Sequence, residues 1–269
     1  MSKRIASLLF ALAALPTAAV AAQPPPAEPE AAPADAPPEP DAKTKWEFAT
    51  IGYVWAAGAW GETDVIGPAE PVDLDLPFGK VLDAFKFAFM GSAEAKRDRL
   101  IFLGDLTIIH LDANHGIGIR DPDFLEAELD SRTAEVTLVG GYRVADKGPV
   151  TLDLLAGGRM NFLKLTLQLD GPNREADGEI KHNWLDPLIG ARLGVPLDGR
   201  WSAGFYGDIG GIITGSDITW QAAPTINYQL NRRMTLGGGW RYYKVKFDKG
   251  DFLYNVHQSG PIVTFRTVF

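Results

Sequence analysis

The stretch GPIVTFRTVF, residues 260–269, decides the fold because its side chains alternate in character from one residue to the next. In an extended strand, successive side chains point to opposite faces. Phe265 and Phe269 therefore share one largely apolar face. Thr264 and Arg266 lie on the opposite face. The stretch predicts a strand that places one face against an apolar medium and the other against a polar one.

The same alternation recurs from Trp46 to Phe269 in segments of about twelve residues or more, whereas strands of soluble proteins average about 5 or 6. Large aromatic residues lie near the segment ends, and the polar faces carry charges that the interior of a soluble β-sandwich would not tolerate. Apolar-out and polar-in alternation is typical of membrane barrels. We therefore predict an all-β fold, a closed antiparallel up-and-down transmembrane β-barrel. A soluble periplasmic β-protein is the alternative fold.

We predict ten strands, with eight or twelve as alternatives. The ten span residues 46–58, 86–97, 100–113, 132–145, 150–170, 184–197, 201–214, 218–230, 234–247 and 253–269. Short polar connections follow the even-numbered strands and long ones follow the first, third and fifth, as in barrels with short periplasmic turns and long extracellular loops. A short helix is predicted around residues 80–85.

Three places interrupt the regular pattern. Pro224 and Pro261 lie inside predicted strands, where each removes a hydrogen-bond donor, so we expect local bulges. In residues 150–170 the polar side chains change from odd to even positions. Either the second half of this strand projects beyond the membrane, or a bulge resets its phase.

The barrel is predicted to occupy residues 46–269, after two segments of different character. In residues 1–21, Lys3 and Arg4 precede an apolar run and small residues, which predicts a secretory signal peptide cleaved near Ala21. A membrane anchor is the alternative, but it needs about 20 apolar residues. Residues 22–45 are rich in proline, alanine and acidic residues and predict a disordered leader, which could also serve as a spacer or docking tail.

Composition excludes several kinds of function. Cysteine is absent, which rules out disulfides, cysteine-ligated metals and cysteine nucleophiles. The formal net charge is -8 and no basic cluster follows a groove, so we expect no nucleic-acid partner. The histidines are dispersed, with no pair at a spacing of two or four, so we predict no metal site and no cofactor.

The segments WLDPLIGARLGVPLDGRWSAGFYGDIGG (184–211), TWQAAPTINYQL (219–230) and SGPIVTFRTVF (259–269) resemble small outer-membrane β-barrels of Gram-negative bacteria, in the broad OmpA/OmpW-like class. The resemblance implies a location in the bacterial outer membrane, within a lipid bilayer that includes lipopolysaccharide. It also implies that the C-terminal aromatic Phe269 is the element recognised by the barrel-assembly machinery, although Thr267 replaces the usual second aromatic.

Charged residues on the polar faces are predicted to form a paired network inside the barrel. They are Glu94, Lys96, Asp105, Glu135, Arg143, Asp153, Arg159, Asp186, Arg192, Asp208, Arg241 and Arg266, six of each sign. A pore selective for one ion sign should carry an excess of the other, and an unpaired buried charge costs several kcal/mol. We therefore predict a mostly closed polar lumen with a structural role. A narrow porin-like conduit for a small solute is the alternative.

A second alternative is a surface-exposed hydrolase acting on peptides or lipids. Histidine with a carboxylate or a hydroxyl is a usable acid–base set. His110 with Asp112, and His257 with Ser259, lie near the predicted extracellular ends of strands. No local catalytic motif accompanies them.

Overall fold

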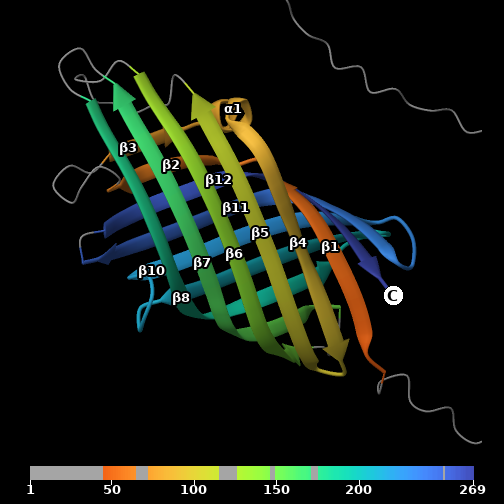
Figure 1. Ribbon diagram of the computed structural model, residues 1–269. Coiled ribbons are helices and arrows are strands. Elements are labelled where there is room, and N and C mark those ends of the chain that lie inside the picture. The colour runs from red at the N-terminus through yellow and green to blue at the C-terminus, as the bar shows by residue number, and fades with distance from the viewer. Residues whose placement is uncertain (1–44, 65–71, 115–125, 146–148, 171–174, 251) are drawn as a thin grey trace, which may run out of the picture. The chain divides into compact units, whose positions relative to one another are not determined.

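The strands of the computed structural model form one continuous antiparallel sheet that closes on itself (Figure 1). The structure describes residues 45–64, 72–114, 126–145, 149–170, 175–250 and 252–269. The predicted signal peptide, and all but the last residue of the predicted leader, lie outside these ranges.

The described elements follow the predicted order of strands, but two strands begin earlier than predicted, at residues 126 and 175 instead of 132 and 184, and a strand at residues 72–76 was not predicted. They are β1 (Glu47–Trp55), β2 (Gly58–Thr63), β3 (Val72–Leu76), α1 (Phe78–Asp83), β4 (Phe85–Arg97), β5 (Leu100–Asn114), β6 (Glu126–Ala145), β7 (Thr151–Asp170), β8 (Glu175–Pro196), β9 (Trp201–Gly211), β10 (Ile218–Gln229), β11 (Met234–Lys249) and β12 (Phe252–Val268). Each strand from β4 to β12 pairs with the next in sequence.

The ring closes where β1 pairs with both β4 and β12. β1 pairs with Ile262–Val268 of β12, and β2 pairs with Tyr254–Ser259 of the same strand. β1 and β2 therefore lie end to end and together occupy one strand position in the wall. Among the described strands, β3 pairs only with β2 and not with β4, and its Leu76 is buried in the apolar core. With β1 and β2 counted together, the barrel has ten strands, which confirms the predicted architecture.

The break between β1 and β2 lies opposite Pro261. The Ala56 N–H donates to the Pro261 carbonyl over 2.9 Å, but proline has no N–H with which to return the bond. The pairing keeps one register on both sides of the break, from Trp55–Ile262 to Gly58–Ser259. Pro224 likewise stays in register with β9. The bulges expected at the two prolines are therefore wrong, because each strand loses a hydrogen bond without gaining a residue.

β7 runs without a break from Thr151 to Asp170, and its register with β8 does not shift. Its odd-numbered side chains face inward throughout: Asp153 and Arg159 are buried toward one end, and Leu165 and Leu167 toward the other. No bulge resets the phase in this stretch. The polarity changes because the surroundings of a straight strand change, both inside and outside the barrel.

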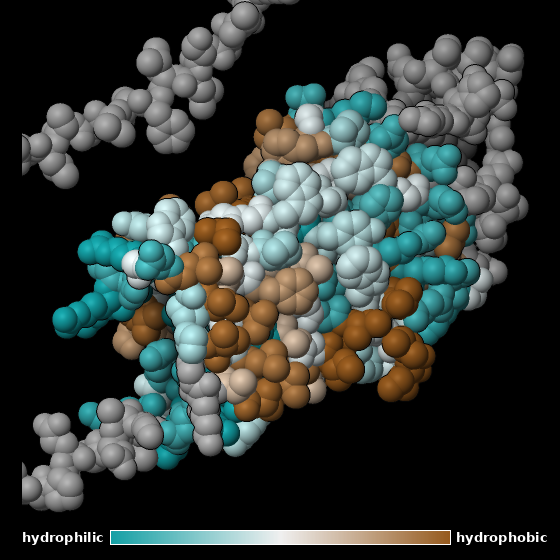
Figure 2. Space-filling model, turned by 180° about the vertical axis from the view of Figure 1, so that it is seen from behind, coloured by the Kyte–Doolittle hydropathy of each residue, from teal (hydrophilic) through white to brown (hydrophobic). Residues whose placement is uncertain are grey.

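Large apolar side chains form an outward-facing belt around the wall. Leu138 and Ile189 are 64% and 65% exposed. Other members include Phe89, Phe102, Leu154, Phe162, Leu185, Phe205, Val263 and Phe265. On the side opposite to that of Figure 1, Figure 2 shows apolar side chains across the middle of the wall and hydrophilic ones toward its ends. An exposed apolar surface of this extent is unfavourable in water, and the hydrocarbon chains of a lipid bilayer would cover it.

No helix among the described residues has the length and apolar character needed to cross a bilayer. The short helix predicted around residues 80–85 is confirmed as α1, which begins directly after Pro77. It carries the chain from β3 back to β4 at one end of the barrel (Figure 1). We call this end the loop end, and the opposite end, where β1 begins and β12 finishes, the terminal end.

Candidate functional site

The lumen is the candidate functional site, because inward-facing side chains from the whole wall meet there. Most of the charged side chains predicted for it lie in the terminal half and at mid-height. The loop half has a different, apolar lining.

Near the terminal end, three arginines and two acidic residues form a continuous network. Asp153 accepts hydrogen bonds from Arg143 Nε at 2.7 Å and from Arg192 Nη2 at 2.9 Å. Arg192 also donates to Glu94, which accepts a second bond from Arg266 Nη2 at 2.9 Å. Glu94 and Asp153 are buried. Every buried carboxylate of this network is thus met by two guanidinium groups.

At mid-height, Arg159 and Asp208 form an ion pair that is shielded from solvent. Arg159 Nη2 donates to Asp208 Oδ2 at 2.7 Å. The same carboxylate oxygen accepts from Tyr206 Oη at 2.8 Å and from Gln221 Nε2 at 2.6 Å. Arg159 Nε also donates to Thr137 Oγ1. Additional hydrogen bonds of this kind are what make a buried ion pair tolerable.

Arg241 joins the same level from the opposite wall. Its Nε donates to Gln221 Oε1 at 2.9 Å, and its guanidinium lies 4.5 Å from the Trp55 ring centroid. Its Nη1 lies 3.4 Å from Tyr53 Oη, which in turn donates to Asp105 Oδ1 at 3.0 Å. We call Tyr53, Trp55, Asp105, Arg159, Asp208, Gln221 and Arg241 the central cluster.

Within the described part of the chain, Asp186 has no direct ion-pair partner, contrary to the prediction. Its carboxylate accepts from Ser216 N–H and Oγ at 2.6 and 2.9 Å, from Asn161 Nδ2 at 3.0 Å and from Trp184 Nε1 at 3.1 Å. Neutral donors therefore replace the expected arginine. Lys96 and Glu135 are placed at the lumen, and within the described ranges neither forms a direct ion pair.

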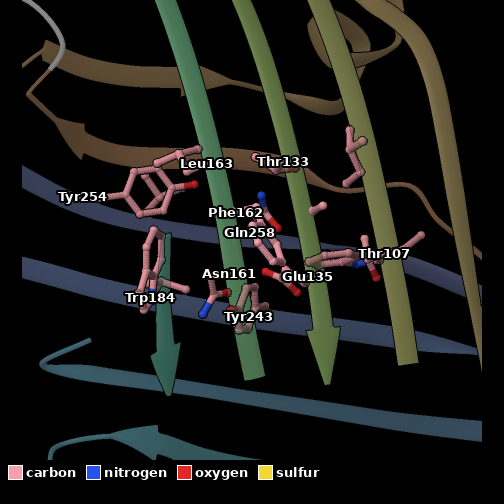
Figure 3. Close-up of a pocket in the computed structure, with 15 residues that line it drawn as sticks. Thr107, Thr133, Glu135, Asn161, Phe162, Leu163, Trp184, Tyr243, Tyr254 and Gln258 are labelled. Atoms are coloured by element: carbon pink, nitrogen blue, oxygen red, sulfur yellow. The ribbon is translucent and has the colours of Figure 1, made fainter. Parts of the chain in front are cut away.

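The central cluster lies between two larger cavities. A small cavity of about 30 Å³ adjoins the cluster, where Glu135, Asn161, Trp184 and Tyr243 project from different strands (Figure 3). That is room for no more than a couple of water molecules, each of which needs roughly 10–15 Å³. Toward the terminal end, a charged vestibule of about 560 Å³ opens. Toward the loop end lies a second cavity of about 270 Å³.

The loop half of the lumen is apolar, which corrects the expectation of a polar interior along the whole barrel. Leu163, Leu165 and Leu167 of β7 pack with aromatic residues of β8, β11 and β12. His182 stacks on Phe252 with ring centroids 4.1 Å apart. The sequence signal of this lining is the run of apolar side chains at odd-numbered positions of β7, from Leu163 to Leu167.

The predicted hydrolase residues do not assemble into one site. His257 lies on the outer wall, stacked against Trp60 at 5.7 Å and near Tyr242 at 6.0 Å. Ser259 Oγ accepts a hydrogen bond from Trp240 Nε1 at 2.8 Å. No carboxylate contacts either residue within the described chain. The two residues share a face, but they belong to a band of aromatic side chains.

His110 and Asp112 lie on the outer face of β5, each with a different partner. His110 Nε2 is 2.9 Å from Asp130 Oδ2, and Asp112 Oδ2 is 3.1 Å from Lys86 Nζ. Desolvation raises the pKa of Asp130, but the His110 hydrogen bond and the Arg132 guanidinium outweigh it and hold the pKa below its usual value. Asp130 could not be predicted as the partner of His110 from sequence, because the contact depends on the pairing of β5 with β6.

Just beyond the apolar belt, a row of basic residues crosses three strands on the outer face. Arg132 is directly opposite Lys164, and Lys164 is directly opposite Lys181. Glu179 Oε1 and Oε2 lie 2.7 Å from Lys181 Nζ and 3.0 Å from Lys164 Nζ. These bonds lower the pKa of Glu179 to about 2. We call Arg132, Lys164 and Lys181 the basic row.

Comparison with known proteins supports the fold. No protein-family model matches the sequence, and no curated protein matches it. The outer membrane protease OmpT from Escherichia coli is similar in structure, with a TM-score of 0.55 and 10% identity over 83% of this chain and 97% of that one. The transport unit of the autotransporter AIDA-I from Escherichia coli gives 0.44 and 8% over 86% and 93%.

The first likeness shows that the chain has the fold of an outer-membrane β-barrel. At 10% identity it shows the fold alone and carries no activity over to this protein. The resemblance to the OmpA/OmpW-like class stays a prediction from sequence.

Proposed function

We propose that this protein is an integral β-barrel of the bacterial outer membrane with a structural role and a lumen that does not conduct. The observation that supports the proposal is the hydrogen-bonded network at mid-height, where Arg159, Asp208 and Arg241 project into the lumen from three different strands. A porin-like conduit for a small solute would need these groups to separate.

The charges themselves favour a closed lumen. Breaking a buried ion pair by removing one partner costs roughly 3–5 kcal/mol, so the pairs favour the closed arrangement strongly over one in which they are separated. Strands on opposite sides of the ring supply the partners, as with Arg192 of β8 and Glu94 of β4. The network therefore connects strands that are far apart in the sequence and holds opposite sides of the barrel together.

The proposed surroundings are a lipid bilayer that includes lipopolysaccharide. Like charges directly opposite each other destabilise a sheet, and the basic row holds three of them in register. Glu179 and Asp130 offset part of this charge. Phosphate groups of lipopolysaccharide at the membrane surface would neutralise the rest. The proposal also includes Phe269 as the element recognised by the barrel-assembly machinery.

Single-channel recording in a planar lipid bilayer tests the closed lumen. Purified, refolded protein should insert and give almost no steady conductance. The variant Arg159→Ala/Arg241→Ala removes two large side chains from the central cluster, and it should raise the frequency of current steps if the barrel still folds. Stable open steps from the wild-type protein would overturn the proposal.

Membrane fractionation tests the location. A barrel in lipid should resist carbonate extraction and should migrate differently on a gel before and after heating. A protein that washes off the membrane and shows no heat shift is not an outer-membrane barrel.

A further inference from the structure

The barrel wall has a seam between β1 and β4 in its loop half. The two strands pair from Glu47–Lys96 up to Gly52–Gly91 and no further. Above this point β2 takes β3 as its neighbour, while β4 stays paired with β5. α1 bridges from β3 to β4 across the end of the seam. Among the described strands, the loop half of the wall is also unpaired along β8 before Leu188, where β9 has ended, but the side between β3 and β4 is the one that α1 spans.

The cavity of about 270 Å³ reaches through the seam. Its inner lining includes the buried Leu129, Leu165 and Leu167. Its outer lining includes Val54, which is 68% exposed, and Phe85, which is 48% exposed. Because Val54 and Phe85 also belong to the exposed apolar surface, the cavity joins the lipid-facing belt to the apolar interior.

The central cluster forms the inner end of the cavity. Its members Tyr53 and Trp55 line the cavity, and Trp55 Nε1 donates to the Arg241 carbonyl oxygen at 3.3 Å, with the Arg241 guanidinium against its ring. A molecule that enters from the membrane therefore meets the hydrogen-bonded side chains of the central cluster before it reaches the terminal vestibule. This arrangement favours binding over passage.

Size and polarity define what fits. Apolar cavities of about 150 Å³ bind benzene-sized molecules, whereas pockets for drug-sized ligands begin at about 300 Å³. The lining is mostly apolar, with a few polar side chains such as Ser131, Thr133 and Gln258. A single flexible hydrocarbon chain satisfies both limits. At the edge of the seam, the exposed Lys86 beside Phe85 is ion-paired with Asp112 at 3.1 Å, and its ammonium group has further N–H donors that a headgroup phosphate can accept from.

We propose that the seam admits one acyl chain of a phosphate-bearing membrane lipid, which lies in this cavity while its headgroup stays at the outer surface near Lys86. The chain enters sideways from the bilayer. It covers the apolar residues of β6 and β7 that otherwise line an open space, and it shields the unpaired edges of β1 and β4 from the surrounding hydrocarbon.

Photocrosslinking tests the proposal. The full chain is reconstituted in vesicles of phosphatidylethanolamine that carries a diazirine at the end of one acyl chain, illuminated, and digested for mass spectrometry. Cross-links are expected on the inward-facing Leu165 and Leu167 as well as on outward-facing Leu154. Cross-links confined to outward-facing residues overturn the proposal. Labelling of the interior by photoreactive free fatty acid but not by the phospholipid also overturns it.

Two matched variants control for folding and for non-specific contact. Ala88→Trp places a large side chain in the cavity beside the seam, and Ala156→Trp places the same side chain on the outer face of β7. Both should keep their heat-modifiable mobility. Interior cross-links should fall to background in Ala88→Trp alone, and interior cross-links that persist there overturn the proposal.

Mass spectrometry of protein isolated from cells separates the two sources of the chain, because phospholipid and lipid A differ in mass. The expected result is one bound lipid per wild-type barrel and none in Ala88→Trp. Equal lipid on both proteins contradicts a chain held in the cavity.

Discussion

Arg159 of β7 and Asp208 of β9 meet inside the barrel at 2.7 Å, with side chains only 1% and 0% exposed. β8 separates their strands in the sheet, so the pair reaches across a neighbouring strand. Gln221 and Tyr206 add hydrogen bonds to the same carboxylate oxygen. Most of the consequences below depend on this enclosed arrangement.

Replacing Arg159 with leucine should lower the free energy of unfolding by roughly 3–5 kcal/mol, because Asp208 would keep a buried charge without its partner. Urea titration in lipid vesicles, followed by the shift in gel mobility, measures the change. Arg159→Leu/Asp208→Leu should recover part of the loss. Arg232→Leu, at an exposed position outside the strands, serves as the control and should behave like the wild type. Equal stability of Arg159→Leu and Arg232→Leu would contradict the role of the pair.

Asp186 organises four neutral donors, so its removal should leave several of them without a partner. Asp186→Ala should destabilise the barrel by more than Asp186→Asn, because asparagine still accepts through one oxygen. Each unsatisfied buried group costs roughly 1–3 kcal/mol. The same unfolding assay compares the two variants. An Asp186→Ala protein as stable as Asp186→Asn would show that the donors find other partners.

The pKa of Glu179, lowered to about 2 by Lys181 and Lys164, sets the pH range of its contribution. Since the folded pKa is below the ordinary value of 4.5, the contribution is fully present above about pH 4.5 and is lost as the pH falls toward 2. Carboxyl-carbon NMR titration should place the transition near the lowered value. Lys181→Gln should move it upward, and an unchanged titration would mean that the contact does not persist in solution.

The aromatic setting of His257 and Ser259 leads us to expect no hydrolysis by this pair. Purified protein in detergent should leave peptide and lipid ester substrates intact. Activity that disappears in His257→Ala would reverse this conclusion. Activity that is equal in wild type and His257→Ala would direct attention to His110 and Asp130 instead.

Phe269 is expected to act in assembly more than in stability. Phe269→Ala should insert more slowly into vesicles that contain the barrel-assembly machinery, with little change in unfolding once it is folded. Phe265→Ala is the matched control, since Phe265 lies on the exposed face of the same strand. Equal insertion rates for Phe269→Ala and the wild-type protein would remove the proposed signal.

The sequence allowed the wall to be predicted but only part of the interior. Period-two alternation depends on each strand alone, so residues such as Phe265 and Arg266 were assigned to the correct faces. Partners depend on the sheet register and on the width of the ring, which no single strand contains. The sequence analysis therefore identified Asp186 and Arg159 as inward-facing, yet it could not show that Asp186 binds Ser216 and Asn161 instead of an arginine.

The apolar loop half was missed for a related reason. The alternation of side chains shows that the two faces of a strand differ in polarity. It does not show which face contacts lipid and which faces the lumen. In β7 the contrast reverses along one straight strand, and the reversal was therefore open to two explanations. Tyr53, Trp55 and Gln221 were missed because neutral residues on a polar face give no charge signal.

The joining of Ala49 to Val268 has a kinetic consequence. The contact brings together nearly opposite ends of the described chain, so its formation must wait until every intervening strand has been made and brought into place. Topologies dominated by such distant contacts fold slowly. Until the hydrogen bonds between β1 and β12 form, the edges of both strands are free to pair with other chains. A chaperone or assembly factor that covers these edges would therefore favour closure of the barrel over aggregation.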